Sequence, residues 1–178
     1  MSDAWVCPEC GLDYGTLHPP FAIQTIKSFP RRYTEALAPA SPTEDNDTVI
    51  RTRPAEGVWS ALEYTAHVAD LMEPFAVTVH RTFTEDNPDL SGVFWDENEK
   101  AAADKYNEQD KDDVLARLTA GAGTLTAEAE KVDANGWTRM AQFGWGDRDL
   151  LTMLQNAVHE GVHHLKDIEQ GLAAVRAS

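Results

Sequence analysis

The chain is poor in cysteine, in basic residues and in long apolar runs, and each shortage excludes a class of protein. Two cysteines among 178 residues are too few for the disulfide framework of a small secreted domain. No apolar run approaches the roughly 20 residues of a membrane-spanning helix, so we expect no membrane partner. The opening stretch MSDAWVCPEC lacks the basic region and apolar segment of a signal peptide, and we therefore expect a cytoplasmic protein.

Basic residues are outnumbered: 15 Lys and Arg stand against 30 Asp and Glu, and the formal net charge is −15. Such a surface repels phosphate backbones, and the densest basic segments, PRRY and RTR, are too small to form a patch. We therefore expect no nucleic-acid partner. The sequence also has no phosphate-binding glycine loop, no Ser-His-Asp arrangement and no heptad seam sustained enough for a coiled coil.

What the chain does contain is an ordinary globular mixture, 42% apolar and 25% charged, in a length sufficient for one proper core. The spacing of the apolar residues predicts four helices, at about residues 21–38, 58–83, 112–132 and 149–175. The second of these is apolar around most of its circumference, and such a helix belongs at the centre of a bundle. We therefore predict an all-α fold, a four-helix bundle.

The first predicted helix contains Pro30, which we expect to kink it or divide it in two. Its buried side is expected to hold Ile23, Ile26, Tyr33 and Leu37. The stretch that follows, APASPTEDNDTVIRTRPAEG, is dense in Pro, Asp, Asn and Thr and is therefore predicted to be a loop.

The last predicted helix contains the stretch NAVHEGVHHLKDIEQG, in which two pairs of metal-ligand types stand four residues apart. One pair is His159 with His163, and the other is Glu160 with His164. Residues four apart share a helix face, so either pair can offer two ligand atoms to one ion.

The apolar stripe of this helix favours one pair over the other. The stripe consists of Leu151, Leu154, Val158, Leu165, Ile168 and Leu172. Measured from its centre, His163 lies about 170° away, towards solvent, and His164 about 90° away. Glu160 and His159 are each about 130° off, on opposite sides, so neither is favoured by its own position. The partner histidine distinguishes the pairs, because His164 lies closer to the apolar stripe than His163. We favour Glu160 and His164 as the inward pair and interpret His159 and His163 as surface residues. The opposite assignment is the alternative.

A metal site needs a ligand from a second helix, and the second predicted helix carries His67 at mid-course in ALEYTAHVADLM. The alternative for this residue is a core histidine satisfied by one hydrogen bond. His80, nearer the helix end, is the weaker ligand candidate. Together His67, Glu160 and His164 would form a two-His, one-carboxylate site with open positions, which suits Zn(II) first and also Fe(II) or Ni(II).

The segment VWSALEYTAHVADLM, followed about ninety residues later by AVHEGVHHLKDIEQG, resembles the DinB-like metal-binding superfamily. That group includes the mycothiol-dependent maleylpyruvate isomerases and the mycothiol or bacillithiol S-transferases. Its pattern is a Trp near the start of the second helix, a His about eight residues on, and (His or Glu)-x3-His in the last helix. The matching positions are Trp59, His67, Glu160, His164, Leu165 and Asp167. The resemblance covers roughly residues 20–173 and implies an up-down-down-up bundle with a divalent ion at one end of its interior.

The resemblance also implies a metal-dependent thiol S-transferase or thiol-dependent isomerase, with a small thiol such as mycothiol and an electrophile as its partners. The chemistry has an independent rationale, because a cation lowers the pKa of a bound thiol and the thiolate is the nucleophile. Tyr64 and His163 are the only candidates for a general base. The alternative is a non-catalytic metal-binding stress or accessory protein. Whether the bundle pairs as a homodimer is left open.

Cys7 and Cys10, in CPECG, form half of a zinc ribbon, and the chain has no further cysteine. We therefore expect an N-terminal knuckle at residues 1–18, ahead of a bundle domain at residues 19–178. A second zinc ion there needs two more ligands. The candidates are His18, His80 and a carboxylate. A redox-active dithiol and two reduced thiols are the alternatives, whereas a structural disulfide is disfavoured.

Three aromatic residues, Trp137, Phe143 and Trp145, cluster just before the fourth predicted helix, with Arg139 and Arg148 in the same stretch. We expect the aromatic residues to pack as core and loop residues or, alternatively, to cover the metal pocket and contact an apolar substrate. The arginines are either solvated or paired with a carboxylate of the thiol or substrate.

Overall fold

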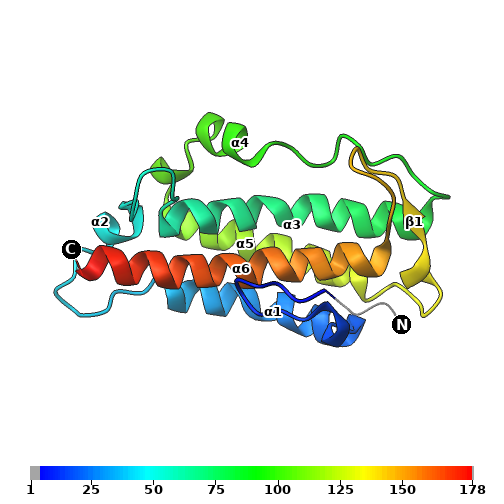
Figure 1. Ribbon diagram of the computed structural model, residues 1–178, viewed down its shortest axis with the longest axis horizontal. Helices are drawn as coiled ribbons and strands as arrows, with labels where there is room; N and C mark the ends of the chain where they lie inside the picture. The colour runs from blue at the N-terminus through cyan, green and yellow to red at the C-terminus, as the bar shows by residue number, and fades with distance from the viewer. Residues whose placement is uncertain (1–4, 178) are drawn as a thin grey trace.

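Four long helices account for most of residues 5–177, which the computed structural model describes (Figure 1). They are α1 (Pro19–Ala36), α3 (Ala61–Thr84), α5 (Lys111–Ala129) and α6 (Leu150–Ala177). The connections hold the short helices α2 (Asn46–Arg51) and α4 (Glu97–Ala103), the 3-10 turns η1 (Tyr14–Thr16), η2 (Tyr106–Glu108) and η3 (Gly136–Thr138), and the strands β1 (Met140–Ala141) and β2 (Arg148–Asp149). The predicted four-helix bundle is confirmed.

The helices are arranged so that α1 and α3 lie on one diagonal of the bundle and α5 and α6 on the other. Both α1 and α3 pack against α5 and against α6. In Figure 1, α1 and α6 run from right to left, whereas α3 and α5 run from left to right. The order is therefore up-down-down-up, as the resemblance implies. None of the helices in the described part of the chain is long and apolar enough to span a membrane.

Helix α1 continues through Pro30 and is not divided. A proline in a helix interior removes one backbone hydrogen bond, which usually destabilises the helix at that point. Here the turns on both sides of the proline are held by the core, because Ile26, Phe29 and Tyr33 are completely buried. The predicted buried side of this helix is confirmed, since Ile23 and Leu37 are buried as well.

Helix α3 begins with a capping box that fixes its starting position. The Ser60 hydroxyl accepts a hydrogen bond from the Glu63 backbone N–H at 3.2 Å, and the Glu63 carboxylate accepts one from the Ser60 N–H at 2.8 Å. Arg53 donates to the same carboxylate at 2.8 Å. The helix therefore starts at Ala61, three residues after the predicted start, and leaves Trp59 just ahead of its first turn.

Helix α6 packs directly against the Phe29 ring of α1 at Gly161, which has no side chain. A Cβ atom at this position would lie 2.2 Å from the Phe29 ring, and the Tyr33 hydroxyl donates a hydrogen bond to the Gly161 carbonyl at 2.9 Å. These contacts fix the rotation of α6 about its own axis. His159 and His163 lie about 160° around the helix from Gly161, on the side turned away from α1, whereas His164 lies about 60° from it.

The stretch between α1 and α3 is not entirely a loop, since it contains α2. Asp45 caps this short helix by accepting a hydrogen bond from the Thr48 N–H at 3.3 Å, and Ile50 is its buried residue. One buried position in six residues leaves no periodic pattern in the sequence. Helix α4 begins after Asp96, whose carboxylate caps it by accepting hydrogen bonds from the backbone N–H groups of Asn98 and Glu99.

Candidate metal centre

His67 on α3 lies opposite Glu160 and His164 on α6, and these three residues form one cluster. Their potential ligand atoms all lie within 4.8 Å of one another. One carboxylate oxygen of Glu160 is 3.5 Å from Nε2 of His67 and 3.3 Å from Nε2 of His164. The structure therefore brings together the three residues that the sequence singles out. That they bind a metal ion stays a prediction.

The His67 side chain is only 3% exposed, and neither of its ring nitrogens has a hydrogen-bond partner among the described residues. The interpretation as a core histidine satisfied by one hydrogen bond is therefore wrong. A buried polar group without a partner costs about 1–3 kcal/mol. A metal ion at Nε2 would give that nitrogen a partner, and the two neighbouring donors are of the types that zinc, iron and nickel accept.

His164 is oriented by a second carboxylate. Its Nδ1 lies 2.8 Å from the Asp167 carboxylate, and this leaves Nε2 directed at Glu160. A carboxylate behind a ligating histidine is the usual way in which proteins fix the ring and raise its basicity. Burial opposes protonation of His164, but the carboxylates of Asp167 and Glu160 raise its pKa to about 9. Burial likewise opposes ionisation of Glu160, yet His164 and His67 hold its pKa well below the ordinary range.

Aromatic rings hold both histidines from the sides. The Tyr64 ring stacks on His164 at 5.0 Å with an interplanar angle of 27°, and Trp59 contacts the His67 ring edge-on at 5.3 Å. Burial raises the pKa of Tyr64 above its ordinary value, so its hydroxyl stays protonated near neutral pH. Tyr64 is therefore poorly suited to the general-base role considered from the sequence and serves instead to position His164.

A cavity of about 610 Å³ opens beside the cluster, with His67 and Glu160 in its lining. This volume is within the usual range for small-molecule sites. Its apolar walls are formed by Leu71, Phe75, Phe94, Trp95, Trp145 and Met153, and its polar ones by Asp96, Glu97, Asn98, Asn156 and His159. Four of the six apolar lining residues are thus aromatic, and the lining includes neither Lys nor Arg.

The aromatic cluster before α6 divides between two places. Trp145 lines the cavity and stacks on Phe143 at 5.1 Å, whereas Trp137 lies in a shallow depression near the start of α1. Neither arginine of this stretch is in the cavity lining. Arg139 donates to the backbone carbonyls of α3's last turn and the residue after it, and Arg148 donates to the carbonyl of Asp147. The pairing of these arginines with a substrate carboxylate finds no support in this geometry.

Comparison with known protein families assigns the chain to one of them. Residues 26–168 match the DinB superfamily, and this segment contains His67, Glu160 and His164. The chain belongs to the DinB superfamily. No curated protein sequence gives a significant match to it.

Two solved structures share the DinB fold of this chain. YfiT from Bacillus subtilis, described as "a probable metal-dependent hydrolase with an unusual four-helix bundle topology", superposes with a TM-score of 0.75 at 19% identity, over 85% of this chain and 84% of YfiT. A mycothiol-dependent maleylpyruvate isomerase superposes with a TM-score of 0.65 at 16% identity, over 87% of this chain. The chain spans 62% of that isomerase. At these identities the likeness concerns the fold.

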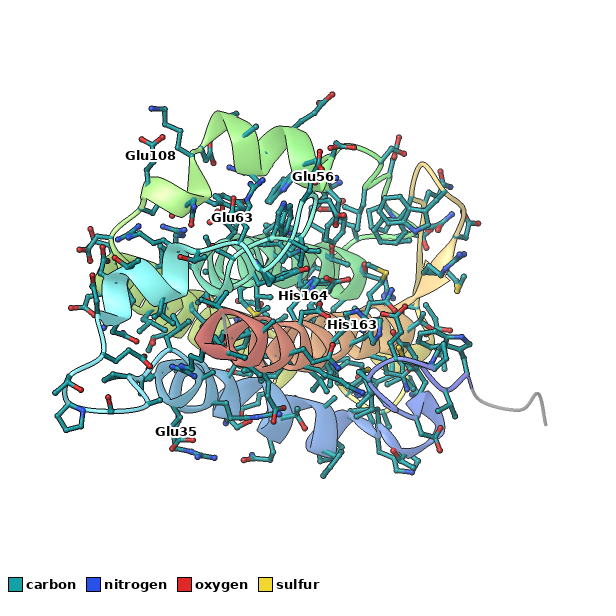
Figure 2. The ribbon with its side chains drawn as sticks, turned by 60° about the vertical axis from the view of Figure 1, so that its left-hand side comes forward. Glu35, Glu56, Glu63, Glu108, His163 and His164 are labelled. Carbon is teal, nitrogen blue, oxygen red and sulfur yellow. The ribbon has the colours of Figure 1, made fainter. Side chains whose placement is uncertain are left out.

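The other two histidines of α6 in this DinB superfamily protein, His159 and His163, are partly buried, which corrects the expectation that they lie exposed at the surface. Residues 5–17, dark blue in Figure 1, cover the face of α6 that carries them. Figure 2 shows His164 between α6 and α3, and His163 on the side of the N-terminal segment. His163 Nδ1 lies 3.7 Å from the Cys7 sulfur, and Nε2 of His159 is buried. Sequence periodicity does not reveal this cover, because the segment that provides it has no helical repeat.

The two cysteines lie next to these histidines and not next to the residues expected from the sequence. Ligand atoms of Cys7, Cys10, His159 and His163 lie within 4.8 Å of one another. His18 is instead the N-cap residue of α1. His80 pairs with Glu128 at 3.1 Å. The expectation that His18 or His80 completes a site with the cysteines is therefore corrected.

Proposed function

We propose that this protein is a metal-dependent enzyme that joins a low-molecular-weight thiol to an apolar electrophile, as a transferase or as a thiol-dependent isomerase. His67, Glu160 and His164 would hold the divalent ion, with zinc the first candidate. The observation that carries the proposal is His67, a buried imidazole that faces a carboxylate beside a cavity and whose two ring nitrogens have no hydrogen-bond partner among the described residues. When bound, a divalent ion with an open position lowers the pKa of a coordinated thiol, so that the thiolate is present at neutral pH.

The residues around the three ligands would keep the donor set in place. Asp167 holds His164 by its Nδ1, while Tyr64 and Trp59 limit the rotation of the two imidazoles. Three protein donors leave open positions on a zinc ion, which is the arrangement of catalytic sites and not of closed structural ones. This arrangement favours chemistry at the metal over simple storage of the ion.

The cavity walls indicate which electrophile fits. Aromatic side chains, Trp145 and Phe94 among them, offer a surface for an apolar or aromatic molecule. The same lining includes Asp96 and Glu97 but no Lys or Arg, so a dianionic substrate would meet repulsion without a compensating partner. We therefore expect an uncharged or cationic electrophile.

A second, smaller hollow of about 380 Å³ offers a place for the thiol. It is lined by Tyr64, His164 and Asp167, and its lining is mostly polar, as the polar body of a small thiol requires. Glu97 and Asn98, in the first turn of α4, line this hollow and also the main cavity. The two reactants would thus approach the His67–Glu160–His164 cluster from two sides of α4.

An assay of thiol consumption tests the proposal. The zinc-loaded protein is incubated with mycothiol, bacillithiol or glutathione and with a panel of uncharged, cationic and anionic electrophiles. We expect consumption with at least one thiol and an uncharged or cationic electrophile, and its loss in Glu160→Ala. Lys27→Ala is the control, because Lys27 is an exposed residue of α1 that pairs with Glu130.

Two other outcomes would contradict the thiol reaction. Hydrolysis by the metal-loaded protein without any thiol would point to an activated water, in keeping with the hydrolase description of YfiT. Metal binding with neither thiol binding nor turnover would favour the non-catalytic metal-binding protein.

A further inference from the structure

Where the N-terminal segment covers α6, four side chains of metal-binding types lie together. Cys7 and Cys10 come from the segment, and His159 and His163 come from α6. One ligand atom from each lies within 4.8 Å of the other three, and the Cys7 sulfur is 3.7 Å from Nδ1 of His163. We propose that these four residues bind a second zinc ion, which fastens residues 5–17 to α6.

The donor set and its spacing are those of a closed structural site. Zinc in structural sites is four-coordinate and tetrahedral, and two cysteines with two histidines are one of its common ligand sets. The pairs Cys7-x2-Cys10 and His159-x3-His163 both have spacings that let two side chains reach one ion. Four protein donors leave no open position, in contrast to the three donors of the His67–Glu160–His164 cluster.

The backbone of the cysteine segment has the tight turn that such a site requires. The Cys7 N–H donates to the Leu12 carbonyl at 2.9 Å, and the Gly11 N–H donates to the Cys7 carbonyl at 2.9 Å. Gly11 has a φ of +77°, a conformation that residues with a side chain seldom adopt. The turn brings both sulfurs to the same side, although the two thiols form no disulfide.

The surroundings of both histidines suit ligands of an ion beside the cysteines. Nε2 of His159 is buried and has no hydrogen-bond partner among the described residues. Nε2 of His163 lies 3.2 Å from the Glu9 carboxylate and 3.7 Å from that of Asp167, so its Nδ1 is left facing the Cys7 sulfur. A carboxylate on the outer nitrogen is the arrangement that fixes a ligating histidine.

The proposed ion would also shape the main cavity. His159 lies in the cavity lining and contacts the Trp5 ring at 5.3 Å. Asn156, one turn earlier in the lining, accepts a hydrogen bond from the Tyr14 hydroxyl at 3.0 Å. Loss of the ion would release the segment that supports this wall. The His67–Glu160–His164 cluster lies on the neighbouring face of α6 and would keep its donors.

Zinc content of the full-length protein tests the site. After zinc loading and dialysis, elemental analysis is expected to find two ions per chain in the wild type and one in Cys7→Ser/Cys10→Ser. His67→Ala is expected to keep one ion as well, because its loss affects the other cluster. His18→Ala is the matched control, a histidine outside both clusters whose side chain makes no capping hydrogen bond.

Replacing zinc by cobalt(II) detects an ion bound by sulfur in the wild-type protein itself, so the test does not depend on the folding of a variant. Only a thiolate-bound cobalt gives an intense thiolate-to-metal charge-transfer absorption. We expect this absorption in the wild type and in His67→Ala, and its loss in the double-serine variant. Absorption in His67→Ala would support the second site even if the thiol chemistry at His67 proves wrong, so the two proposals can fail separately.

Three results would overturn the proposal. The first is a cobalt-loaded wild type without the charge-transfer absorption. The second is a double-serine variant that retains its full zinc content. The third is a Cys7–Cys10 disulfide that forms in the presence of excess zinc, with no effect on metal content, because a redox-active dithiol would then explain the two cysteines.

Discussion

Helix α6 carries two pairs of residues with the same spacing, and the structure gives the two pairs different surroundings. Glu160 and His164 meet His67 beside a cavity of about 610 Å³. His159 and His163 meet two cysteines beneath residues 5–17. The first cluster has three donors next to open space, whereas the second has four donors under a cover. Spacing on a helix therefore selects which residues can share an ion, but the number of donors and the cover distinguish a reactive site from a structural one.

The strongest way to separate the two clusters is to remove a donor from one of them. His67→Ala is expected to lower zinc affinity at its cluster by more than the roughly 10–100-fold that loss of an outer partner costs. The cysteine cluster should bind zinc unchanged. Calorimetric titration with zinc measures both affinities, and His80→Ala is the control, since His80 pairs with Glu128 outside both clusters. A His67→Ala protein with both affinities intact contradicts the assignment of the first cluster.

A substitution that disturbs both faces of α6 together provides the next test. In Gly161→Ala the new Cβ would meet the Phe29 ring at 2.2 Å, which forces α6 away from α1. We expect a loss of about 1–3 kcal/mol in the free energy of unfolding, measured with urea, and weaker zinc binding at both clusters. Gly123→Ala is the matched control, because a Cβ there meets nothing within 4 Å. This control should be neutral or stabilising by up to about 1 kcal/mol. Equal stabilities of the two variants would show that the close approach of α6 to α1 is unimportant.

Two outer carboxylates allow a finer comparison. Asp167 lies 2.8 Å from Nδ1 of His164, whereas Glu9 lies 3.2 Å from Nε2 of His163. Asp167→Asn is therefore expected to reduce zinc affinity at the His67 cluster by about 10–100-fold, and Glu9→Gln to act on the cysteine cluster alone and more weakly, since Glu9 is exposed. Elemental analysis across a series of chelator concentrations resolves the two effects. If each variant affects both clusters equally, the clusters are not independent.

The last comparison concerns the pH dependence of the metal-free protein. Burial opposes protonation of His164, but Asp167 and Glu160 raise its pKa from 6.5 to about 9. A group whose pKa is higher in the folded state stabilises the protein below its unfolded pKa and ceases to do so above its folded one. Stability should therefore fall by up to about 3 kcal/mol as the pH rises from 6.5 to 9. Urea unfolding at several pH values measures this change. The slope should flatten in Asp167→Asn, and an unchanged slope there would exclude the carboxylate as its cause.

The four long helices were predictable because each buries a repeating apolar stripe. Every predicted end lies within three residues of the observed one; for the last helix, residues 149–175 compare with Leu150–Ala177. The short helix α2 was not predictable, because Ile50 is its one buried residue and a single position shows no period. Of the two predicted effects of Pro30, the division of the helix is absent, since the burial of Ile26 and Phe29 holds α1 together at that point.

The candidate site was partly predictable from one helix and one histidine. The spacing of four residues relates Glu160 to His164, and the need for a ligand from a second helix indicates His67. The structure brings the three residues together. The surroundings of His159 and His163 were not predictable. The sequence pattern places them on a polar face of α6, which is typical of a solvent-exposed surface. The sequence of the cysteine segment does not indicate which surface that segment covers.

The sequence by itself determined the helices, the two pairs on α6 and the Cys7-x2-Cys10 turn, because each is a local pattern within a few residues of chain. Only the tertiary structure decided which side of α6 meets α3 and which meets the cysteines. That rotation depends on Gly161 against Phe29, a contact between α6 and α1, and on where residues 5–17 lie. Periodicity records which face of a helix is apolar, but it contains no information about the segment that covers a polar face.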